Sequence, residues 1–450
     1  MRTRTLGILA ALTVGFTASV AWPASAATAD PPSAAAQLLA SQPLAAGDGW
    51  AAAGTGTTGG AAADADHVFV VRTRAELVAA LGGNNATNGT NAVPKIVFIA
   101  GKINANVDDS NNPLTCANYA DPAYSLDAFL ATYDPAVWGR VTLPSGPLED
   151  ARVRSSRVQR ERIMLNVGSN TTIIGLKGAK LVGGNLLLTN ISTAIIRNVS
   201  FEDAADCFPA WTPTDGALGN WNSLYDNITL SGATNVWVDH NTFTDGANQD
   251  VDQPIYLGRP YQVHDGLLDI IRGSDLVTVS YNYMFEHDKS MLIGSTNTPG
   301  VDVGKLRVTL HHNRFANLGQ RVPRVRFGQV DVYNNYYYLT DEDVFQYAWG
   351  VGVQSAIYAE NNFILRSADI PLDAVVYNWG GLAMTEKGSL TRIGTGAVVA
   401  VNFLEEFNAT RDPDIATDAG WTPTLRTAVD ATADVPARVT AGAGVGKLPI

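Results

Sequence analysis

The stretch Val308-Thr309-Leu310-His311-His312-Asn313-Arg314-Phe315 decides the fold of this chain, because it is one copy of a recurring unit. In each copy, a few β-branched or aliphatic residues lead to an asparagine, and an aromatic residue follows closely. The other copies are 195–198 with Phe201, 236–241 with Phe243, 277–282 with Phe285, 330–335 with Tyr337, 356–363 and 398–403. Such repetition predicts stacked β units.

The spacing of these copies favours a β-helix. Asn313 and Asn335 are 22 residues apart, which suits one coil, and longer gaps such as Asn241 to Asn282 leave room for loops. Equivalent asparagines would form a ladder, because an amide both donates and accepts hydrogen bonds. A β-propeller or sandwich is the alternative, but hairpin signals are scarce, and Asn88-Gly89 lies outside the repeats. We therefore predict an all-β, right-handed parallel β-helix with long loops on one face.

Residues 1–26 have the pattern of a secretory signal peptide. Arg2 and Arg4 give a positive start, a mostly apolar stretch follows, and Ala24-Ser25-Ala26 is a small-residue cleavage site. The apolar stretch is short for a membrane span. We expect a secreted, extracellular protein without a membrane partner, in which residues 27–450 form a single β-helical catalytic domain with N- and C-terminal extensions packed on it.

The charge balance limits the possible partners. The formal charge of −12 becomes −14 without Arg2 and Arg4, because residues 1–26 contain no acidic residue. An acidic surface disfavours nucleic acid, whose binding draws on a broad basic surface. A polyanionic substrate would need cations placed locally. We also expect a monomer.

The two cysteines, Cys116 and Cys207, are candidates for a disulfide bond. In an exported protein, a disulfide is favoured over a metal site or a nucleophile. A bond across so long a loop would mainly restrain the unfolded chain.

Two arginine-rich segments stand out. Residues 320–328 carry Arg321, Arg324 and Arg326 around Pro323, which disfavours a regular ladder and indicates a bend, an edge or a loop mouth. Such a cluster suits paired hydrogen bonds to carboxylates, although a solvated strand edge is the alternative. Residues 146–162 hold five more arginines and fit a short surface helix, to which we assign no ligand.

Three aspartates are candidate metal ligands. Asp265 and Asp269 are about 13 Å apart in a fully extended strand, and Gly266 between them can supply a bend. Asp226 lies one coil earlier, and adjacent coils are about 4.8 Å apart. Three carboxylates favour a hard cation, and calcium outside the cell. Taken singly, each aspartate also suits a turn or a helix cap.

The order of these motifs resembles that of extracellular pectate lyases, a family of polysaccharide lyases. The matching pieces are Val236-Trp237-Val238-Asp239-His240, Asp265 to Asp269, Val279-Ser280-Tyr281-Asn282-Tyr283, Lys289 and Arg321-x-Pro323-x-x-Arg326. The resemblance runs from about Gly49-Trp50 to 441–444, nearly the whole mature chain.

This resemblance implies calcium-dependent cleavage of α-1,4-polygalacturonate, the acidic polysaccharide of pectin, by β-elimination to 4,5-unsaturated oligogalacturonides. It also implies the site residues: Ca2+ ligands Asp226, Asp265 and Asp269, the catalytic base Arg321, and the substrate-carboxylate partners Lys289 and Arg326. Asp239 and His240 match a motif with a structural role. Leu224 stands where some members carry a further acidic ligand, so the number and affinity of bound ions stay open, as does endo or exo cleavage.

An arginine base implies an unusual pKa. The guanidinium pKa lies above 12, so lowering it to about 9 costs roughly 5 kcal/mol, in the direction that calcium, Lys289 and Arg326 all push. We expect an alkaline optimum. Arg324 is left as a structural or surface residue.

Three other functions are alternatives to this one. A pectin lyase acting on methyl-esterified pectin has no substrate charge to neutralise, and the three aspartates count against it. A polygalacturonase needs paired acids around a water, and the one candidate aspartate pair, Asp108-Asp109, lies in a polar loop before the repeats. A non-catalytic carbohydrate-binding β-helix would not need Lys289, Arg321 and Arg326. The segment 207–222, with Trp211 and Trp221, lines the groove or caps a coil.

Overall fold

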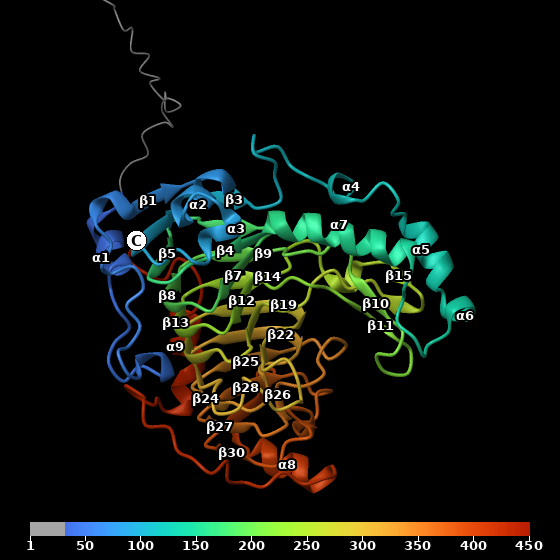
Figure 1. The fold of residues 1–450 in the computed structure, drawn as a ribbon. Helices are drawn as coiled ribbons and strands as arrows, with labels where there is room; N and C mark the ends of the chain where they lie inside the picture. Colours follow the sequence, from blue (N-terminus) through green and yellow to red (C-terminus); the bar gives the residue numbers. More distant parts are fainter. Residues whose placement is uncertain (1–31) are drawn as a thin grey trace, which may run out of the picture. The chain divides into compact units, whose positions relative to one another are not determined.

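Residues 32–450 of the computed structural model form a right-handed parallel β-helix, which confirms the predicted fold (Figure 1). Three long sheets, each built by pairing equivalent strands of successive coils, form its walls. The signal-peptide prediction for residues 1–26 lies outside the described residues. Within those residues, no helix has the length and apolar character of a membrane span.

Two of the sheets have ten strands each. The first contains β1 Val68–Val71, β2 Lys95–Ile99, β5 Thr171–Gly175, β8 Ser192–Arg197, β13 Thr234–Asp239, β18 Asp275–Ser280, β21 Val308–His311, β24 Gln329–Tyr333, β27 Ala356–Glu360 and β30 Met384–Lys387. The second contains β3 Lys102–Asn104, β6 Lys180–Val182, β9 Ser200–Glu202, β14 Thr242–Thr244, β19 Tyr283–Lys289, β22 Arg314–Gln320, β25 Tyr336–Leu339, β28 Phe363–Arg366, β31 Leu390–Ile393 and β32 Val399–Ala400.

The third sheet has eight strands and is called the groove sheet below. It contains, in spatial order, β29 Val376–Trp379, β26 Trp349–Gly352, β23 Arg324–Val325, β20 Leu292–Ile293, β17 Leu268–Ile271, β12 Ile228–Ser231, β7 Asn185–Thr189 and β4 Met164–Asn166. Two short hairpins lie apart from the coils: β10 Ala210–Thr212 with β11 Asn220–Asn222, and β15 Ile255–Tyr256 with β16 Arg259–Pro260.

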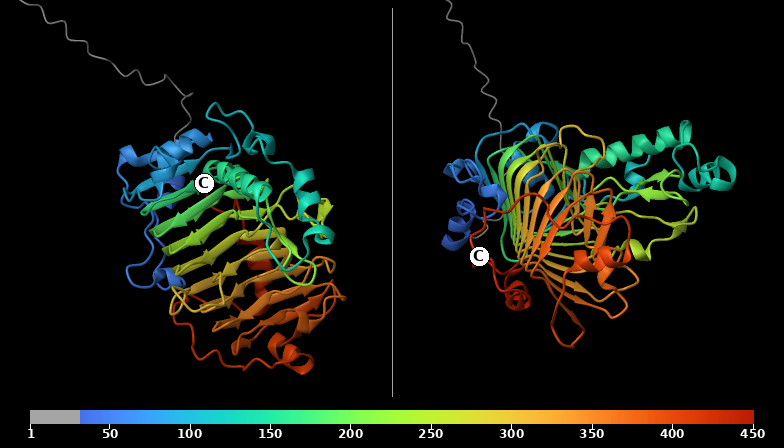
Figure 2. Two further views of the ribbon diagram at one scale, coloured as in Figure 1. Left: turned by 45° about the vertical axis from the view of Figure 1, so that its right-hand side comes forward. Right: turned by 90° about the horizontal axis from the view of Figure 1, so that it is seen from below.

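The helices lie outside the coils (Figure 2). They are α1 Ala34–Ala40, α2 Arg74–Leu81, α3 Asn85–Asn88, α4 Cys116–Tyr119, α5 Leu126–Tyr133, α6 Pro135–Trp138, α7 Pro147–Ile163, α8 Phe403–Thr410 and α9 Val435–Gly442.

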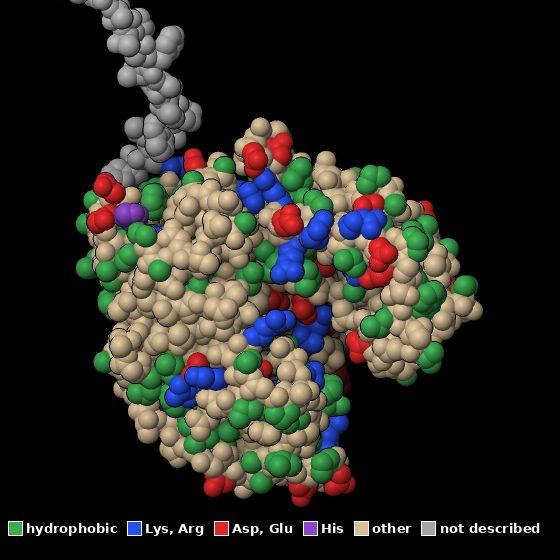
Figure 3. Space-filling view, viewed as in Figure 1, with side chains coloured by type: hydrophobic (Ala, Val, Ile, Leu, Met, Phe, Trp, Pro, Cys, Tyr) green, Lys and Arg blue, Asp and Glu red, His purple; other side chains and the backbone are tan. Residues whose placement is uncertain are grey.

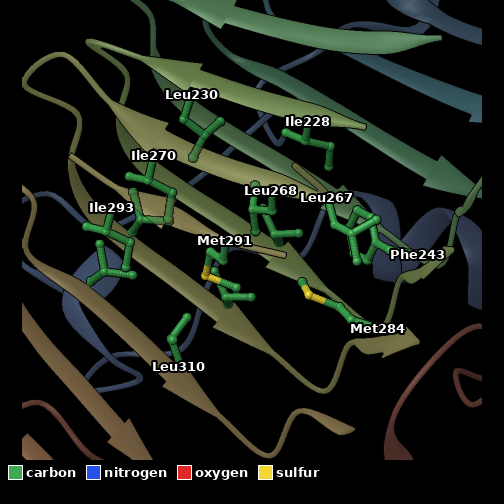
Figure 4. Close-up of a cluster of buried hydrophobic side chains, with 14 of the residues drawn as sticks. Ile228, Leu230, Phe243, Leu267, Leu268, Ile270, Met284, Met291, Ile293 and Leu310 are labelled. Atoms are coloured by element: carbon green, nitrogen blue, oxygen red, sulfur yellow. The ribbon is translucent and has the colours of Figure 1, made fainter. Parts of the chain in front are cut away.

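The core is a continuous stack of apolar side chains between the three sheets. On the groove sheet, alternate residues such as Ile228, Leu268 and Ile270 point inward and are fully buried (Figure 4). The register places Ile228 directly beside Leu268, and Ile270 beside Ile293. Each such side chain stabilises the fold by about 1.5–3 kcal/mol on burial. The residues between them therefore face outward, where they can form a site.

The predicted asparagine ladder exists at the turn between the first and second sheets. It comprises Asn241, Asn282, Asn313, Asn335 and Asn362, all fully buried. The Nδ2 of each of the first four donates to the Oδ1 of the next asparagine, at 3.1 Å, 3.1 Å, 3.0 Å and 3.2 Å. The same Oδ1 atoms accept the backbone N–H of the preceding asparagine. The five coils that carry these asparagines are thereby joined in sequence, and no amide of the ladder is left unpaired.

Two of the seven sequence copies do not join this ladder. Arg197 pairs with Asp239, so Asn198 matches His240 and the ladder position is Val199. Asn198 instead takes the left-handed conformation of the turn, with φ of 55°. Asn402 caps the N-terminus of α8, accepting from the backbone N–H groups of Leu404 and Glu405, so the copy at 398–403 is not a coil. The sequence interpretation was wrong at both.

Residues 105–163, 205–225 and 245–263 together build an arm beside the coils, which carries α4–α7 and the two hairpins (Figure 1). Its own apolar cluster contains Phe129, Tyr133, Trp211 and Trp221. Trp211 and Trp221 are thus packed inside the arm rather than along the groove. The predicted disulfide between Cys116 and Cys207 is present and ties α4 to the segment before β10.

Segments at both ends of the described chain run along the coils. The backbone N–H of Trp50 donates to the Thr309 hydroxyl, and that of Gly446 donates to the Oδ1 of Asn198. The side chain of Arg426 forms ion pairs with Asp331 and Glu360.

Candidate active site

Three aspartates converge on the outer side of the groove sheet. Asp226, Asp265 and Asp269 each offer a carboxylate oxygen, and these oxygens lie within 4.8 Å of one another. Asp226 and Asp269 are buried, while the Asp265 side chain is 31% exposed. The opening therefore lies on the Asp265 side, toward the groove.

The coil geometry brings these residues together. Asp226 precedes β12 and Asp265 precedes β17, and these neighbouring strands pair in parallel, with Thr229 beside Asp269. Gly266 contributes space rather than a left-handed turn, since its φ is not positive. A Cβ at Gly266 would lie 2.5 Å from the Oδ1 of Asp269 and 2.8 Å from that of Asp226. Any larger residue would push the two carboxylates apart.

Neutral donors hold two of the carboxylates in place. Asp226 accepts from the Thr229 hydroxyl at 2.5 Å and from the Gly266 N–H at 2.9 Å. Asp269 accepts from the Leu292 N–H at 3.0 Å. Burial and the charge of Asp265 raise the pKa of Asp226 to about 7. Burial, with Asp226 and Asp265 nearby, raises the pKa of Asp269 well above its usual value. The cluster is short of positive charge.

This donor set fits calcium. All ligand atoms are oxygens, and calcium binds carboxylates in a flexible geometry of six to eight oxygens, with substrate or water completing the shell. A divalent cation would also relieve the repulsion that raises the two pKa values.

Lys289 and Arg321 face the same cluster. The Nζ of Lys289 lies 3.4 Å from the Oδ1 of Asp265, and the Nη1 of Arg321 lies 3.8 Å from the same oxygen. Lys289 is 5% exposed, so it is not the exposed ion-paired lysine that was the alternative. Lys289 pairs with Gln320 at the ends of β19 and β22, which places the two cations side by side.

Arg321 has an unusual setting for an arginine. Its backbone is left-handed, with φ of 60°, and its Nε is buried without a hydrogen-bond partner among the described residues. Burial lowers the pKa of Arg321, but Asp265 and Asp269 outweigh burial and the pKa is raised. The neighbouring carboxylates thus hold the guanidinium in its charged form.

Arg326 lies deeper in the same wall. Its Nη1 donates to the Gly294 carbonyl at 2.7 Å and its Nε to Asn297 Oδ1 at 2.6 Å. Burial and the charge of Arg321 lower its pKa. Asn297 and Gly294 fix the fork of the guanidinium, which leaves Nη2 as the nitrogen for a ligand.

Arg324 packs against aromatic side chains, which agrees with the structural one of its two predicted roles. Its guanidinium stacks on the ring of Trp379, 3.8 Å from the centroid, and Tyr347 and Tyr377 complete an aromatic cluster around that ring. It belongs to the floor of the groove sheet, because it lies between Leu292 and Gly350 in the register.

A buried histidine network behind the cluster was not predicted. His287 Nε2 lies 2.9 Å from the Asp265 carbonyl, and its Nδ1 lies 2.7 Å from Asp245. Burial lowers the pKa of His264, but hydrogen bonds to Asp203 and Asp250 outweigh it and raise that pKa to about 10. The sequence does contain a signal for this network, because His264 directly precedes Asp265 and His287 lies two residues before Lys289.

Asp239 and His240 lie away from this cluster. Asp239 is buried and forms an ion pair with Arg197 and a hydrogen bond from the Ser280 hydroxyl, both along the first sheet. These contacts join adjacent coils.

A family model described as pectate lyase matches residues 148–420. The chain belongs to the pectate lyase family. A pectate lyase from Bacillus subtilis (strain 168) is 47% identical over 427 residues, which cover 93% of this chain and 96% of the relative. Pectate lyase D from Dickeya chrysanthemi is 34% identical over 373 residues, 79% of this chain and 82% of its own length.

Solved pectate lyase structures share the fold. A thermostable pectate lyase superposes with a TM-score of 0.89 at 48% identity, covering 91% of this chain and 99% of the other. A pectate lyase bound to a hexasaccharide gives 0.85 at 45% identity, with the same coverage. This chain is therefore a pectate lyase by family, a polysaccharide lyase, and the predicted resemblance is confirmed.

Proposed function

We propose that this pectate lyase cleaves α-1,4-polygalacturonate by calcium-dependent β-elimination and releases 4,5-unsaturated oligogalacturonides. The observation that carries this proposal is the convergence of three aspartate carboxylates with Lys289 and Arg321 on one side of the groove sheet. The proposed calcium ligands are Asp226, Asp265 and Asp269.

The reaction requires positive charge around one uronate carboxylate. The base removes the hydrogen on C5, the C5–H electron pair forms the C4–C5 double bond, and the C4–O bond to the leaving sugar breaks. The leaving oxygen then takes up a proton. Negative charge develops next to a carboxylate that is already negative, so electrostatic stabilisation of that group sets the rate.

Asp226, Asp265 and Asp269 would hold calcium, which when bound would supply positive charge beside the substrate carboxylate. Lys289 and Arg326 are the proposed partners of that substrate carboxylate. Both are nearly buried, so their charges act in a region of low dielectric where each ionic hydrogen bond is strong. Asn297 holds the Arg326 guanidinium in its orientation.

Arg321 is the proposed base. Asp265 and Asp269 raise its pKa in their ionised form, so Arg321 can release its proton only after the charges of these aspartates are neutralised. Lys289 and Arg326 then disfavour a third positive charge beside them. We therefore expect activity to rise into the alkaline range, as Arg321 loses its proton.

The proposal extends to the cellular setting. Residues 1–26 would be removed on secretion, and residues 27–450 would act outside the cell as one monomeric catalytic domain. The partner is an acidic polysaccharide rather than nucleic acid, because the net charge of −12 leaves only local cationic sites.

The test is a pH profile of Arg321→Lys and Arg321→Ala on polygalacturonate, read from the ultraviolet absorbance of the unsaturated product. We expect both variants to lose roughly 100- to 10,000-fold in kcat, the usual contribution of a general base. Arg324→Lys is the control and should retain most of the activity. Near-normal turnover by either Arg321 variant would contradict the assignment of the base.

A further inference from the structure

One face of α7 is directed toward the groove. Val153, Ser156, Arg157, Arg160 and Glu161 lie three or four residues apart, so they share one stripe of the helix. The opposite face packs on the rest of the molecule. No ligand is predicted for this arginine-rich segment from its sequence, and it has no part in the proposed catalysis.

Two cavities meet at this stripe, and both are lined by Arg157 and Arg160. The first has a volume of about 480 Å³ and includes Leu224, two residues before Asp226. The second has a volume of about 550 Å³ and reaches Leu187 and Asn166 on the groove sheet. In Figure 3, Lys and Arg side chains gather over α7 and in the hollow beneath it. The two arginines thus stand between neighbouring openings.

The floor of these cavities continues the row that contains the aspartates. The strand register pairs Asp269 with Thr229, Thr229 with Leu187, and Leu187 with Asn166. Three strand spacings of about 4.8 Å place Asn166 roughly 14 Å from the aspartate cluster along the coil axis. A polymer bound at the cluster and lying along this row would pass beneath α7.

The positive charges of Arg157 and Arg160 are available to bind such a polymer, because no acidic residue in the described part of the chain pairs closely with either. The other three arginines of the helix pair closely with acids: Arg152 with Glu149, Arg154 with Asp121, and Arg162 with Asp109.

By contrast, Arg157 lies 4.0 Å from Glu161, with both side chains mostly exposed. Arg160 forms no ion pair within the described residues 32–450. An exposed pair of this kind is weak and yields readily to another carboxylate.

Hydrogen bonds hold α7 in place and thereby fix the positions of Arg157 and Arg160. Gln159, on the buried face, donates to the Ala205 carbonyl and accepts from the Cys207 N–H. The hydroxyl of Tyr225, the residue before Asp226, donates to the Ser156 carbonyl at 3.2 Å. The position of α7 is therefore coupled directly to the segment that carries an aspartate of the cluster.

We propose that Arg157 and Arg160 form a remote carboxylate-binding subsite for the same polyuronate chain, about three coils from the bond that is cleaved. Guanidinium groups bind carboxylates through paired hydrogen bonds, and regularly spaced uronates supply such carboxylates. The subsite favours long polymers over short oligomers. This inference rests on the proposed function, because it assumes a polyuronate substrate in the groove.

The experiment compares polygalacturonate with trigalacturonate as substrates of the full-length chain. The variants are Arg157→Gln/Arg160→Gln and, as the matched control on the same helix, Arg154→Gln, which lines neither cavity. For the double variant, we expect KM on the polymer to rise about tenfold, with kcat within about twofold, as two partly exposed charge pairs imply. KM on the trimer should not change, and the polymer effect should shrink at high salt.

The outcomes separate this inference from the proposed function. An unchanged polymer KM, or an equal loss on polymer and trimer, would overturn the remote subsite while leaving the lyase proposal intact. An equal rise in KM for Arg154→Gln would also overturn the remote subsite, because the loss of any positive charge from α7 would then have the same effect. A wild-type chain that releases no unsaturated product from either substrate would overturn both.

Discussion

The stacked coils align polar side chains at two corners, with opposite consequences. At the corner between the first and second sheets, five buried asparagines pass hydrogen bonds from coil to coil. At the edge of the groove sheet, Asp226, Asp265 and Asp269 are aligned by the same stacking but can only accept hydrogen bonds. An asparagine amide forms a hydrogen bond with another amide one coil away. An ionised carboxylate is instead repelled by a neighbouring carboxylate.

The asparagine corner contributes stability, and the aspartate corner contributes function. The ladder stabilises the coils at no electrostatic cost. The aspartate cluster lowers stability in the absence of a cation, because burial and mutual repulsion raise the pKa values of Asp226 and Asp269. This repulsion favours cation binding, because a bound cation relieves the repulsion between the carboxylates and thereby binds more tightly.

The largest expected effect, on activity, comes from replacing one carboxylate of the aspartate cluster by an amide like those of the asparagine ladder. In Asp269→Asn, the amide removes one repelling charge and one calcium ligand. Activity on polygalacturonate should fall by at least about 100-fold. In the presence of a chelator, however, the variant should unfold at a higher temperature than the wild type, as measured by calorimetry. A variant that is less stable than wild type under chelation would contradict the contrast between the corners.

The next effect comes from breaking the ladder. In Asn282→Ala, the N–H of Asn241 loses its acceptor, the Nδ2 of Asn241 loses one of its two acceptors, and the Oδ1 of Asn313 loses one of its two donors. We expect the free energy of unfolding to fall by about 3 to 5 kcal/mol, because several buried polar groups lose hydrogen bonds and the side-chain amide of residue 282 is removed. Urea unfolding measures this. Asn198→Ala is the control outside the ladder and should cost less.

The smallest effect is a pH dependence of stability confined to the chelated protein. The pKa of Asp226 is raised to about 7 in the folded state, so its favourable contribution is present below the unfolded pKa and is lost as pH rises toward 7. Unfolding free energy should fall by roughly 2 kcal/mol between about pH 5 and about pH 7, at 1.36 kcal/mol per pH unit. Saturating calcium should abolish this slope, and a slope that persists would point to other groups.

Much of the fold was predictable because the β-helix repeats its own pattern. Asn313 and Asn335 mark one coil in both the sequence and the structure. The copy at Asn198 failed because the turn contains two adjacent positions, a left-handed one and a ladder one, and a single asparagine suits either. The copy at Asn402 failed because an asparagine after a strand also caps a helix.

The site was less predictable where it depends on contacts across loops. The residues implied by the family resemblance, Asp226, Asp265, Asp269, Lys289 and Arg321, do meet. The stacking of Arg324 on Trp379 and the contact of His287 with Asp245 join residues from different coils. Because loop lengths between strands vary, spacing along the chain does not predict which side chains of neighbouring coils come into contact.

The most direct test of the central claim is a chelator and calcium add-back assay on polygalacturonate, with the unsaturated product followed by its ultraviolet absorbance. We predict that chelation abolishes product formation and that calcium restores it in the wild type but far less in Asp269→Asn. Undiminished product formation in excess chelator would contradict the claim that the aspartate cluster works as a calcium site in catalysis.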